Sequence, residues 1–279
     1  MRRRRAVEWR RGEADRYDQR PKNPVRWEKR TVDSGGVRLA ARVSGGEGTT
    51  IILVHGLGFG RRTWHRVAPR LNARGLRVVA YDQRGHGASG TSRDYSLKAF
   101  VGDLAAVVVA LAIEEPVVVG YSMGAAVVVA YAARYGGCSG VVCVDGGYPA
   151  PTPEPDWGAI EATMRRPATR LALWVMKLAR VGSGMSFAEQ RHVAEEYDAT
   201  LPRLDAAYEQ MACPVMLVAA SRADRVPQGE EMRAALTEGV ENFRERHPGA
   251  RVERLPCGHN VPWECPGDLA ELIATFTHP

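Results

Sequence analysis

An apolar run that ends in a serine between two glycines, within residues 116–135, sets the architecture expected of this chain. Val117–Val119 predicts a buried strand, and the Ala- and Val-rich segment after Met123 predicts a helix. Between them, Gly120–Gly124 has the G-x-S-x-G spacing that holds a serine on a sharp strand-to-helix turn. Glycine on either side lets the strand and the helix approach without a side-chain clash. The pattern predicts that the Ser122 hydroxyl stands at the end of a strand, beside backbone N–H groups at a helix N-terminus.

Further apolar runs alternate with helical segments along the chain. Partial alternation on both sides of Asp33–Gly36 first predicts an antiparallel hairpin of Val25–Val32 and Val37–Val43. Short apolar runs then predict buried strands at Thr50–Val54, Arg77–Tyr81, Gly140–Val144, Pro214–Ala219 and Arg251–Leu255. Such alternation predicts the α/β class, with a doubly wound, mostly parallel sheet between two layers of helices.

Length and charge narrow the class further. With 279 residues, 45% of them hydrophobic and 25% charged, the chain has the composition of a globular protein with one main core. The net charge of +6 comes from residues 1–30, which carry +7 and leave −1 for the remainder. A nearly neutral body argues against a nucleic-acid partner. Residues 1–24 are predicted to be a basic, solvated arm, with binding to an anionic surface as the alternative.

The spacing of the cysteines and glycines argues against a metal ion and a dinucleotide cofactor. The five cysteines show no C-x-x-C spacing and no histidine cluster accompanies them, so we expect no metal site and a reducing, cytoplasmic compartment. The glycines after His55 fail as a dinucleotide fingerprint because Arg61 and Thr63 stand where its last glycine would be. We therefore expect no bound cofactor. No apolar run reaches the roughly 18 residues that a membrane span needs.

The alternating pattern stops at Gly147 and resumes near Pro214. Four prolines, from Pro149 to Pro155, predict a stiff connector, and the residues after it predict helices without a strand. The expected helices are Asp156–Arg166, Ala168–Val181, Ser186 to about Ala199, and Leu204–Met211. We expect residues 147–213 to form a helical cap (lid) beside the site, on a core of residues 25–146 and 214–279. Apolar side chains of this cap that we expect in a substrate pocket are Trp157, Met164 and Trp174.

Three groups suited to nucleophilic catalysis follow different predicted strands, in the order Ser122, Asp224, His259. Functional groups in open parallel sheets gather at the carboxyl ends of the strands. Neutral imidazole can take the proton of a serine hydroxyl, and a carboxylate can fix the imidazole tautomer. His86, in a glycine-rich turn after another strand, is expected to pack that turn.

At this point the chain, over residues 25–279, resembles the α/β-hydrolase superfamily. The resemblance is carried by His55–Gly58, Asp82–Gly87, the G-x-S-x-G motif, Asp224 and Gly258-His259. It implies Ser122 as nucleophile, His259 as base and Asp224 as acid, with oxyanion donors at the backbone N–H groups of Leu57 and Met123. It also implies the helical cap. Some members take the acid from the end of the sixth strand, here Asp145, which we do not favour because Gly-Gly follows it. Tyr121, beside the nucleophile, is added to the expected pocket.

These residues predict a serine hydrolase that forms an acyl-enzyme on Ser122 and acts on a small molecule. Expected substrates are esters, lactones, thioesters or amides with an apolar portion under the cap. A serine in place of the aspartate nucleophile of the superfamily's dehalogenases and epoxide hydrolases argues against those chemistries. An acyltransferase or perhydrolase with the same triad is the alternative, and a non-catalytic ligand-binding member is a further one.

Overall fold

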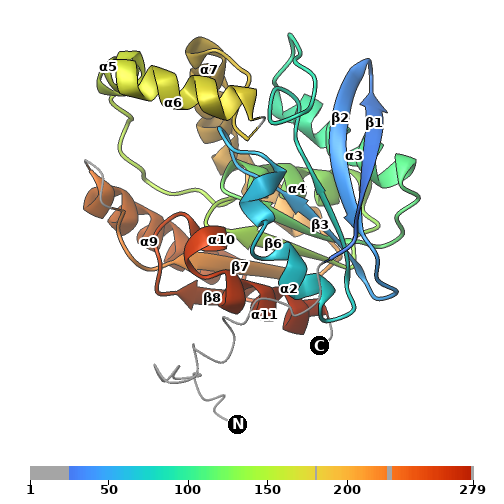
Figure 1. Ribbon diagram of the computed structural model, residues 1–279. Helices are drawn as coiled ribbons and strands as arrows, with labels where there is room; N and C mark the ends of the chain where they lie inside the picture. Colours follow the sequence, from blue (N-terminus) through green and yellow to red (C-terminus); the bar gives the residue numbers. More distant parts are fainter. Residues whose placement is uncertain (1–24, 180, 225–227, 278–279) are drawn as a thin grey trace.

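A single sheet of eight strands forms the centre of the computed structural model, which describes residues 25–179, 181–224 and 228–277 (Figure 1). Their order in the sheet is β1-β2-β4-β3-β5-β6-β7-β8. The first two strands pair antiparallel, as do β2 and β4, and all remaining pairs are parallel. The strands are β1 (Trp27–Ser34), β2 (Val37–Ser44), β3 (Thr50–Val54), β4 (Arg77–Tyr81), β5 (Val117–Tyr121), β6 (Gly140–Val144), β7 (Val215–Ala220) and β8 (Arg251–Leu255). The predicted α/β class and mostly parallel sheet are confirmed.

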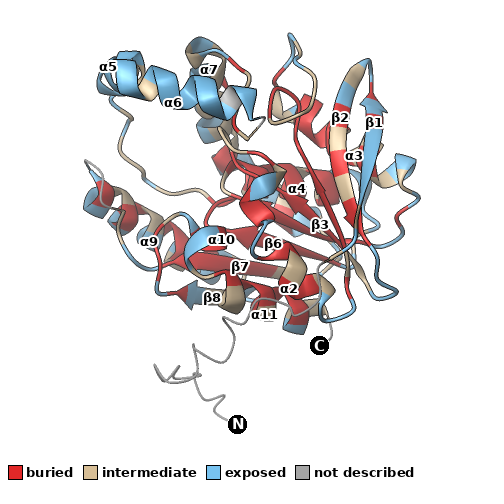
Figure 2. Cartoon of the chain, viewed as in Figure 1, coloured by how far each residue is buried: buried red, intermediate tan, exposed pale blue. Residues whose placement is uncertain are grey.

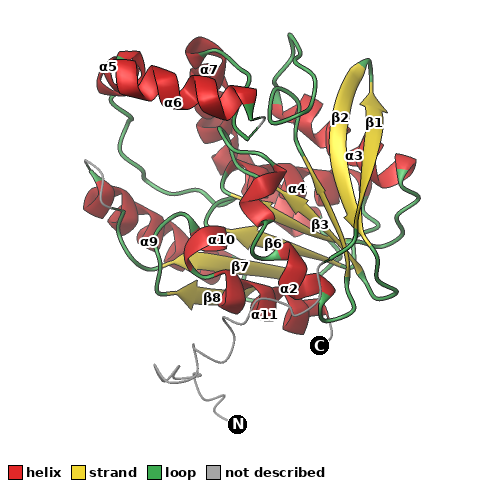
Figure 3. Cartoon of the chain, viewed as in Figure 1, coloured by secondary structure: helices red, strands yellow, loops and turns green. Residues whose placement is uncertain are grey.

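Helices cover both faces of this sheet (Figure 3). The core helices are α2 (Ala68–Asn72), α3 (Leu97–Ala110), α4 (Met123–Tyr135), α9 (Gly229–Arg246), α10 (Val261–Glu264) and α11 (Pro266–Thr277), with a 3-10 turn, η1 (Arg61–Trp64). Between β6 and β7 lie α5 (Trp157–Arg165), α6 (Pro167–Leu178), α7 (Phe187–Thr200), a 3-10 turn η2 (Leu201–Arg203) and α8 (Leu204–Gln210). No helix among the described residues is long and apolar enough to cross a membrane.

The core consists of two apolar clusters, one on each face of the sheet (Figure 2). Alternate residues of β5 point to opposite faces, so Val118 joins the cluster beneath α3 and α4, while Val119 joins the one beneath α2 and α11. Both valines are 0% exposed. Coverage on both faces explains why these strands are apolar runs rather than alternating sequences.

Helix ends follow the capping residues of the sequence. The side chain of Ser96 accepts from the backbone N–H of Ala99 at the start of α3, and Ser186 forms a capping box with Glu189 at the start of α7. Apolar residues recur at helical spacing over residues 64–74, but α2 begins only at Ala68. Pro69 explains the late start, since its ring is tolerated in the first turn of a helix and not further inside.

Residues between β6 and β7 are helical wherever the structure describes regular elements in that stretch, and the four predicted helices are found within a few residues of their expected bounds. In Figure 1, α5, α6 and α7 lie together at the top of the molecule, away from α2 and α11. The division into a core and a cap of residues 147–213 stays a prediction. The basic arm, residues 1–24, lies outside the described residues.

Candidate active site

The turn between β5 and α4 holds Ser122 in a backbone conformation that few residues other than glycine adopt, with φ 54° and ψ −123°. Close packing enforces this turn. A Cβ at Gly120 would lie 2.2 Å from the carbonyl oxygen of Gly124, and one at Gly124 would lie 2.6 Å from that of Val54. The glycine requirement predicted from the motif is therefore a direct consequence of backbone contact. Met123 begins α4, so its N–H is among those without a partner inside the helix.

His259 stands in the loop after β8 and bonds Ser122 with one ring nitrogen. Its Nε2 lies 3.1 Å from Ser122 Oγ, which is hydrogen-bonding distance. The side chain is 35% exposed, so one edge of the ring remains open to solvent. The ring also packs beside Tyr121, with 5.2 Å between the ring centroids. The predicted approach of imidazole and hydroxyl, 137 residues apart in sequence, is present in the structure.

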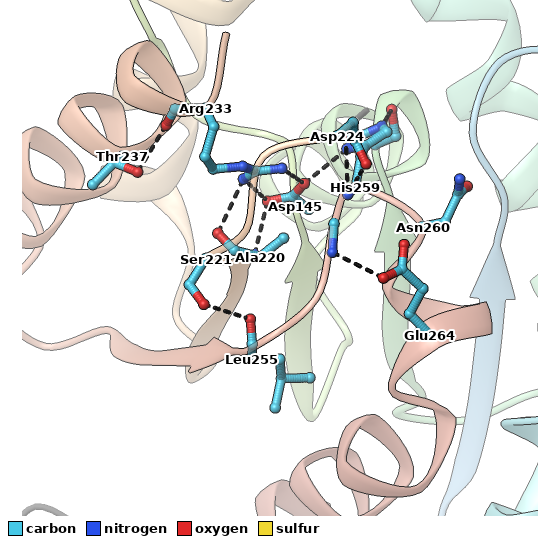
Figure 4. Close-up of polar contacts among 12 residues, drawn as sticks. Asp145, Ala220, Ser221, Asp224, Arg233, Thr237, Leu255, His259, Asn260 and Glu264 are labelled. Carbon is cyan, nitrogen blue, oxygen red and sulfur yellow. Dashed lines mark hydrogen bonds and ion pairs between the residues drawn. The ribbon is translucent and has the colours of Figure 1, made fainter. Parts of the chain in front are cut away.

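The other imidazole nitrogen bonds Asp145, the residue that follows β6. His259 Nδ1 lies 2.7 Å from Asp145 Oδ2, and the Asp145 side chain is 0% exposed. Asp145 also accepts from the backbone N–H of Ala220 at 2.9 Å and pairs with both terminal nitrogens of Arg233 at 3.0 Å (Figure 4). Burial by itself would raise the pKa of Asp145. The hydrogen bonds from His259 and Arg233 outweigh burial and hold that pKa below its usual value, so the group is a carboxylate.

Asp224 occupies a different place from the one expected. Its carboxylate oxygens accept from the backbone N–H of His259, at 3.1 and 3.3 Å, and make no contact with the ring nitrogens. A Cβ at Gly258 would lie 2.3 Å from Asp224 Oδ1, so the two loops are packed tightly there. The geometry corrects the expectation that Asp224 holds the imidazole: Asp145 does so, and Asp224 anchors the loop that carries the histidine.

Arg233, on the second turn of α9, is the site residue that sequence reasoning missed. Its side chain is 9% exposed, and besides Asp145 it bonds the carbonyl oxygen of Ala220. An arginine on a polar helix is ordinarily a surface residue, and no motif surrounds this one. The one available signal was indirect, because a carboxylate directly after a fully buried strand needs a partner.

The loop after β3 passes directly beside the serine. A Cβ at Gly56 would lie 3.0 Å from Ser122 Cβ, so this glycine allows an approach that another residue would block. Leu57 follows Gly56 and is partly buried against the core. Leu57 and Met123, the two residues expected to supply oxyanion donors, thus flank Ser122 from the loop after β3 and from the start of α4.

Two buried histidines fix that loop. His55 and His86 lie with their ring centroids 4.9 Å apart, and both rings are placed to donate from Nδ1 to a carbonyl oxygen. At Nε2, His55 accepts from the backbone N–H of Gln83 at 3.0 Å and His86 accepts from that of Gly58 at 3.3 Å. Burial lowers the pKa of His86 to about 4 and that of His55 well below its usual value. His86 therefore packs the loop as a neutral ring, as expected for it.

Two cavities adjoin the site. A cavity of about 270 Å³ reaches the catalytic groups and is lined by Ser122, Asp145, Gly146, Tyr148, Ala150, Thr152, Pro153, Pro155, Tyr197, Asp198, Leu201, Asp224, Met232, Leu236 and His259. A larger, mainly apolar cavity of about 730 Å³ lies under α5 and α6 and is lined by Gly58, Glu161, Met164, Arg165, Arg170, Leu173, Trp174, Met176, Gly182, Ser183, Gly184, Met185, Phe187 and Gln190. Gly58 belongs to the loop that passes Ser122, so the second cavity borders that loop.

The four residues expected in a pocket are distributed unevenly. Met164 and Trp174 line the larger cavity. Trp157 lines neither, and packs instead against Phe187 with 6.3 Å between ring centroids. Tyr121 is 0% exposed and its hydroxyl donates to Asn260, so the structure places it in the core beneath the histidine rather than in a cavity wall. A side chain that precedes the nucleophile on a strand points to the opposite face, which explains this position.

A family model described as "Alpha/beta hydrolase family" matches residues 51–272, which is most of the chain and includes Ser122, Asp145 and His259. The chain belongs to the alpha/beta hydrolase family. The predicted superfamily is therefore confirmed, and the strand order and the strained serine turn are the parts of this hydrolase fold that position the site.

Individual relatives agree with the family over shorter stretches. A monoacylglycerol lipase of Mycolicibacterium smegmatis is 42% identical over 93 residues, which is 31% of this chain and 33% of the relative. A protein of Synechocystis sp. described as "Putative non-heme chloroperoxidase" is 40% identical over 93 residues, 33% of each chain. These matches span about a third of the length of the relatives. The enol-lactonase structure from Burkholderia xenovorans shares the fold, with a TM-score of 0.70 over 90% of this chain and all of that one, at 21% identity.

Proposed function

We propose that this alpha/beta hydrolase is a serine hydrolase that cleaves an ester, lactone, thioester or amide bond of a partly apolar small molecule. One observation carries the proposal: His259 bonds Ser122 Oγ with Nε2 and a buried carboxylate with Nδ1, at 3.1 and 2.7 Å. That is the hydrogen-bonded chain that activates a serine hydroxyl at neutral pH.

In the proposed reaction, Ser122 Oγ attacks the substrate carbonyl carbon while His259 Nε2 takes the hydroxyl proton. The tetrahedral intermediate collapses, the bond to the leaving group breaks, and the imidazolium returns the proton to the leaving alcohol, thiol or amine. Water then gives a proton to His259 and attacks the acyl carbon. The bond to Ser122 Oγ breaks, the imidazolium returns its proton to that oxygen, and the acid is released.

Asp145 is the proposed acid of this triad. Its bond to Nδ1 fixes the tautomer in which Nε2 is free to accept the serine proton. Arg233 and the N–H of Ala220 are proposed to position the carboxylate, because between them they bond both of its oxygens. Asp224 is proposed to act on the histidine only through its backbone.

The proposed oxyanion donors are the backbone N–H groups of Leu57 and Met123. Met123 lies at the start of a 13-residue helix, where the N–H groups and the helix dipole favour negative charge. The loop that carries Leu57 is held by neutral His86 through the N–H of Gly58. A donor fixed in this way needs little rearrangement as charge develops on the substrate oxygen.

Cavity sizes support a substrate with one small and one larger apolar part. The cavity of about 270 Å³ next to Ser122 accommodates a short acyl or leaving group. The cavity of about 730 Å³ beneath α5 and α6 is in the size range of pockets for whole small molecules. Met164 and Trp174 are proposed to contact the larger apolar part.

Labelling with a fluorophosphonate tests the mechanism. The wild-type protein should be labelled, and Ser122→Ala and His259→Ala should show neither labelling nor turnover. A series of esters and lactones of increasing acyl length then identifies the substrate class. Full turnover by Ser122→Ala would rule out the acyl-enzyme.

A second candidate function keeps the triad and replaces water by another acceptor, such as peroxide or an alcohol. The similarity to a protein named as a chloroperoxidase favours testing it. Product analysis with peroxide or an alcohol in competition with water separates the two functions, since an acyl transferase would form peracid or ester in excess over acid.

A further inference from the structure

Large apolar side chains are exposed in one place above all, the helix pair α5–α6. Ten large apolar residues are exposed among the described residues, and seven of them lie on these two helices. The seven are Ile160, Leu171, Leu173, Trp174, Val175, Met176 and Leu178. The other three, Val109, Tyr135 and Trp263, lie on different elements. Figure 2 shows α5 and α6 as a mostly exposed pair above the buried core.

Helix α6 presents apolar residues on two of its sides. Leu173 and Met176 line the cavity of about 730 Å³. Leu171, Val175 and Leu178 do not line it, and at 62%, 49% and 71% exposure they form a stripe at i, i+4 and i+7 that faces away from it. Trp174, 61% exposed, lies between the two sides. We call Leu171, Trp174, Val175 and Leu178 the outer stripe. A helix that is apolar on nearly every side is ordinarily covered.

The net charge of the helix pair indicates which kind of partner covers the outer stripe. Residues 157–178 contain three arginines and one lysine but a single acidic residue, Glu161, for a net charge of +3. Two copies of this helix pair facing each other would bring two such charges together, which disfavours a second copy of the chain. An anionic surface would be attracted. The outer stripe also lies on a protruding helix rather than in a groove, which suits a flat surface better than a peptide.

We propose that α5–α6 docks on an anionic lipid surface, with the outer stripe in the acyl–headgroup boundary and Arg166, which is exposed at the junction of the two helices, among the headgroups. Basic residues beside a tryptophan and aliphatic side chains are the composition of helices that lie in such an interface. The opposite side of the same helix lines the larger cavity, so a docked molecule would open that cavity next to the lipid. Resting on the proposed function, this assigns the substrate class: carbonyl compounds that partition into a bilayer, such as esters with a long acyl chain.

Vesicle sedimentation tests docking apart from catalysis. The full chain carrying Ser122→Ala is mixed with vesicles of phosphatidylcholine alone, or with about 30% phosphatidylglycerol. We expect binding to the anionic vesicles that weakens with added salt. Adding Leu171→Gln, Val175→Gln and Leu178→Gln together should weaken it by about tenfold or more, and Arg166→Glu alone by several-fold. Val109→Gln is the control, because it removes an even more exposed valine, 79% against 49% for Val175, from α3 and should change nothing.

Every one of these proteins keeps the basic arm, so any binding by the arm is common to all. Equal binding by the triple variant and its parent would overturn the proposal, as would a dimer in light scattering that only the triple variant abolishes. The replaced side chains are exposed, so thermal unfolding should be unchanged and confirms that each variant is folded.

Turnover distinguishes this proposal from the proposed function. With Ser122 restored, the triple variant should hydrolyse water-soluble p-nitrophenyl acetate at the wild-type rate. It should lose about tenfold on a monoacylglycerol carried in the anionic vesicles. Turnover of the soluble ester without vesicle binding would overturn the docking proposal alone. Vesicle binding without turnover or labelling would overturn the proposed function alone.

Discussion

We expect replacement by asparagine to lower kcat strongly at Asp145 and only slightly at Asp224. Asp145 lies 2.7 Å from His259 Nδ1, and its side chain is 0% exposed. Asp145→Asn therefore removes a buried negative charge that lies next to the imidazole. An asparagine there can offer an N–H to Nδ1, which stabilises the wrong tautomer. We expect kcat to fall about 10⁴-fold, equivalent to about 5 kcal/mol of transition-state stabilisation.

Asp224→Asn should cost less than about tenfold in kcat, because it meets the histidine only at the backbone N–H. An asparagine keeps a carbonyl oxygen that can accept that bond. Both variants are assayed for steady-state turnover of the best ester and for fluorophosphonate labelling at matched pH.

Stability has to be measured beside activity, because Asp145→Asn leaves the buried Arg233 guanidinium without its carboxylate. Breaking such a pair costs about 3–5 kcal/mol, which corresponds to a fall in Tm of about 10 °C for a chain of this size. Activity is therefore compared well below the Tm of the variant. A 10³-fold or larger loss in Asp224→Asn, together with a loss under about tenfold in folded Asp145→Asn, would refute the assignment.

Three further predictions concern the elbow, the buried histidines and the cavity. Gly120→Ala should destabilise the protein by more than about 3 kcal/mol in denaturant unfolding, since its Cβ would lie 2.2 Å from a backbone oxygen; Gly102→Ala, with nothing within 4 Å in α3, should be neutral or slightly stabilising. The pKa values of His55 and His86 are lowered in the folded protein, so below about pH 6.5 the unfolded chain takes up protons that the folded chain does not. The contribution of these two rings to the free energy of unfolding is therefore fully present above about pH 6.5 and is lost as the pH falls towards 4. Unfolding free energies at pH 7.5 and 5.5 should differ by about 3 kcal/mol from these two rings, and a flat profile would contradict their neutral state. Trp174→Ala should raise KM for long-chain esters and leave KM and kcat for an acetyl ester unchanged. An equal rise in KM for both substrates would argue against a place for this ring in the larger cavity.

The fold follows closely from sequence because its signals are local. Val117–Val119 and the other apolar runs are short and β-branched, and Ser96 and Ser186 cap helices where their sequence context indicates. The pairing of Ser122 with His259 could also be predicted, since each residue follows a strand and sits beside glycine. The late start of α2 shows how one proline overrides an amphipathic pattern.

The carboxylate that bonds the His259 ring could not be chosen correctly from sequence, because two aspartates follow adjacent strands and the choice depends on loop packing. Gly146-Gly147 argued against Asp145 because these glycines lead directly from it into the predicted connector to the cap. In the structure these glycines are required by contact: a Cβ at Gly146 would lie 2.7 Å from the carbonyl oxygen of Ser122, and one at Gly147 2.8 Å from Ala125 Cβ. They allow the strand end that carries Asp145 to press against the nucleophile turn. Arg233, which completes the pairing, is 88 residues away and leaves no local trace.

In the proposed catalytic cycle, the ion pair between Arg233 and Asp145 changes the charge balance around the histidine. In a triad whose aspartate bonds the imidazole and no other charged group, the aspartate and the neutral ring together carry one negative charge. Protonation of the ring makes that pair neutral. Here the carboxylate and the guanidinium already cancel, so a protonated ring adds a whole positive charge to the site. The negative groups then near the ring are the Asp224 carboxylate, which accepts from the backbone N–H of His259, and the substrate's own oxygen. Acid, base and oxyanion are therefore coupled electrostatically, and a substrate that develops less negative charge at its carbonyl should lose more of its rate enhancement here than in a hydrolase without that arginine.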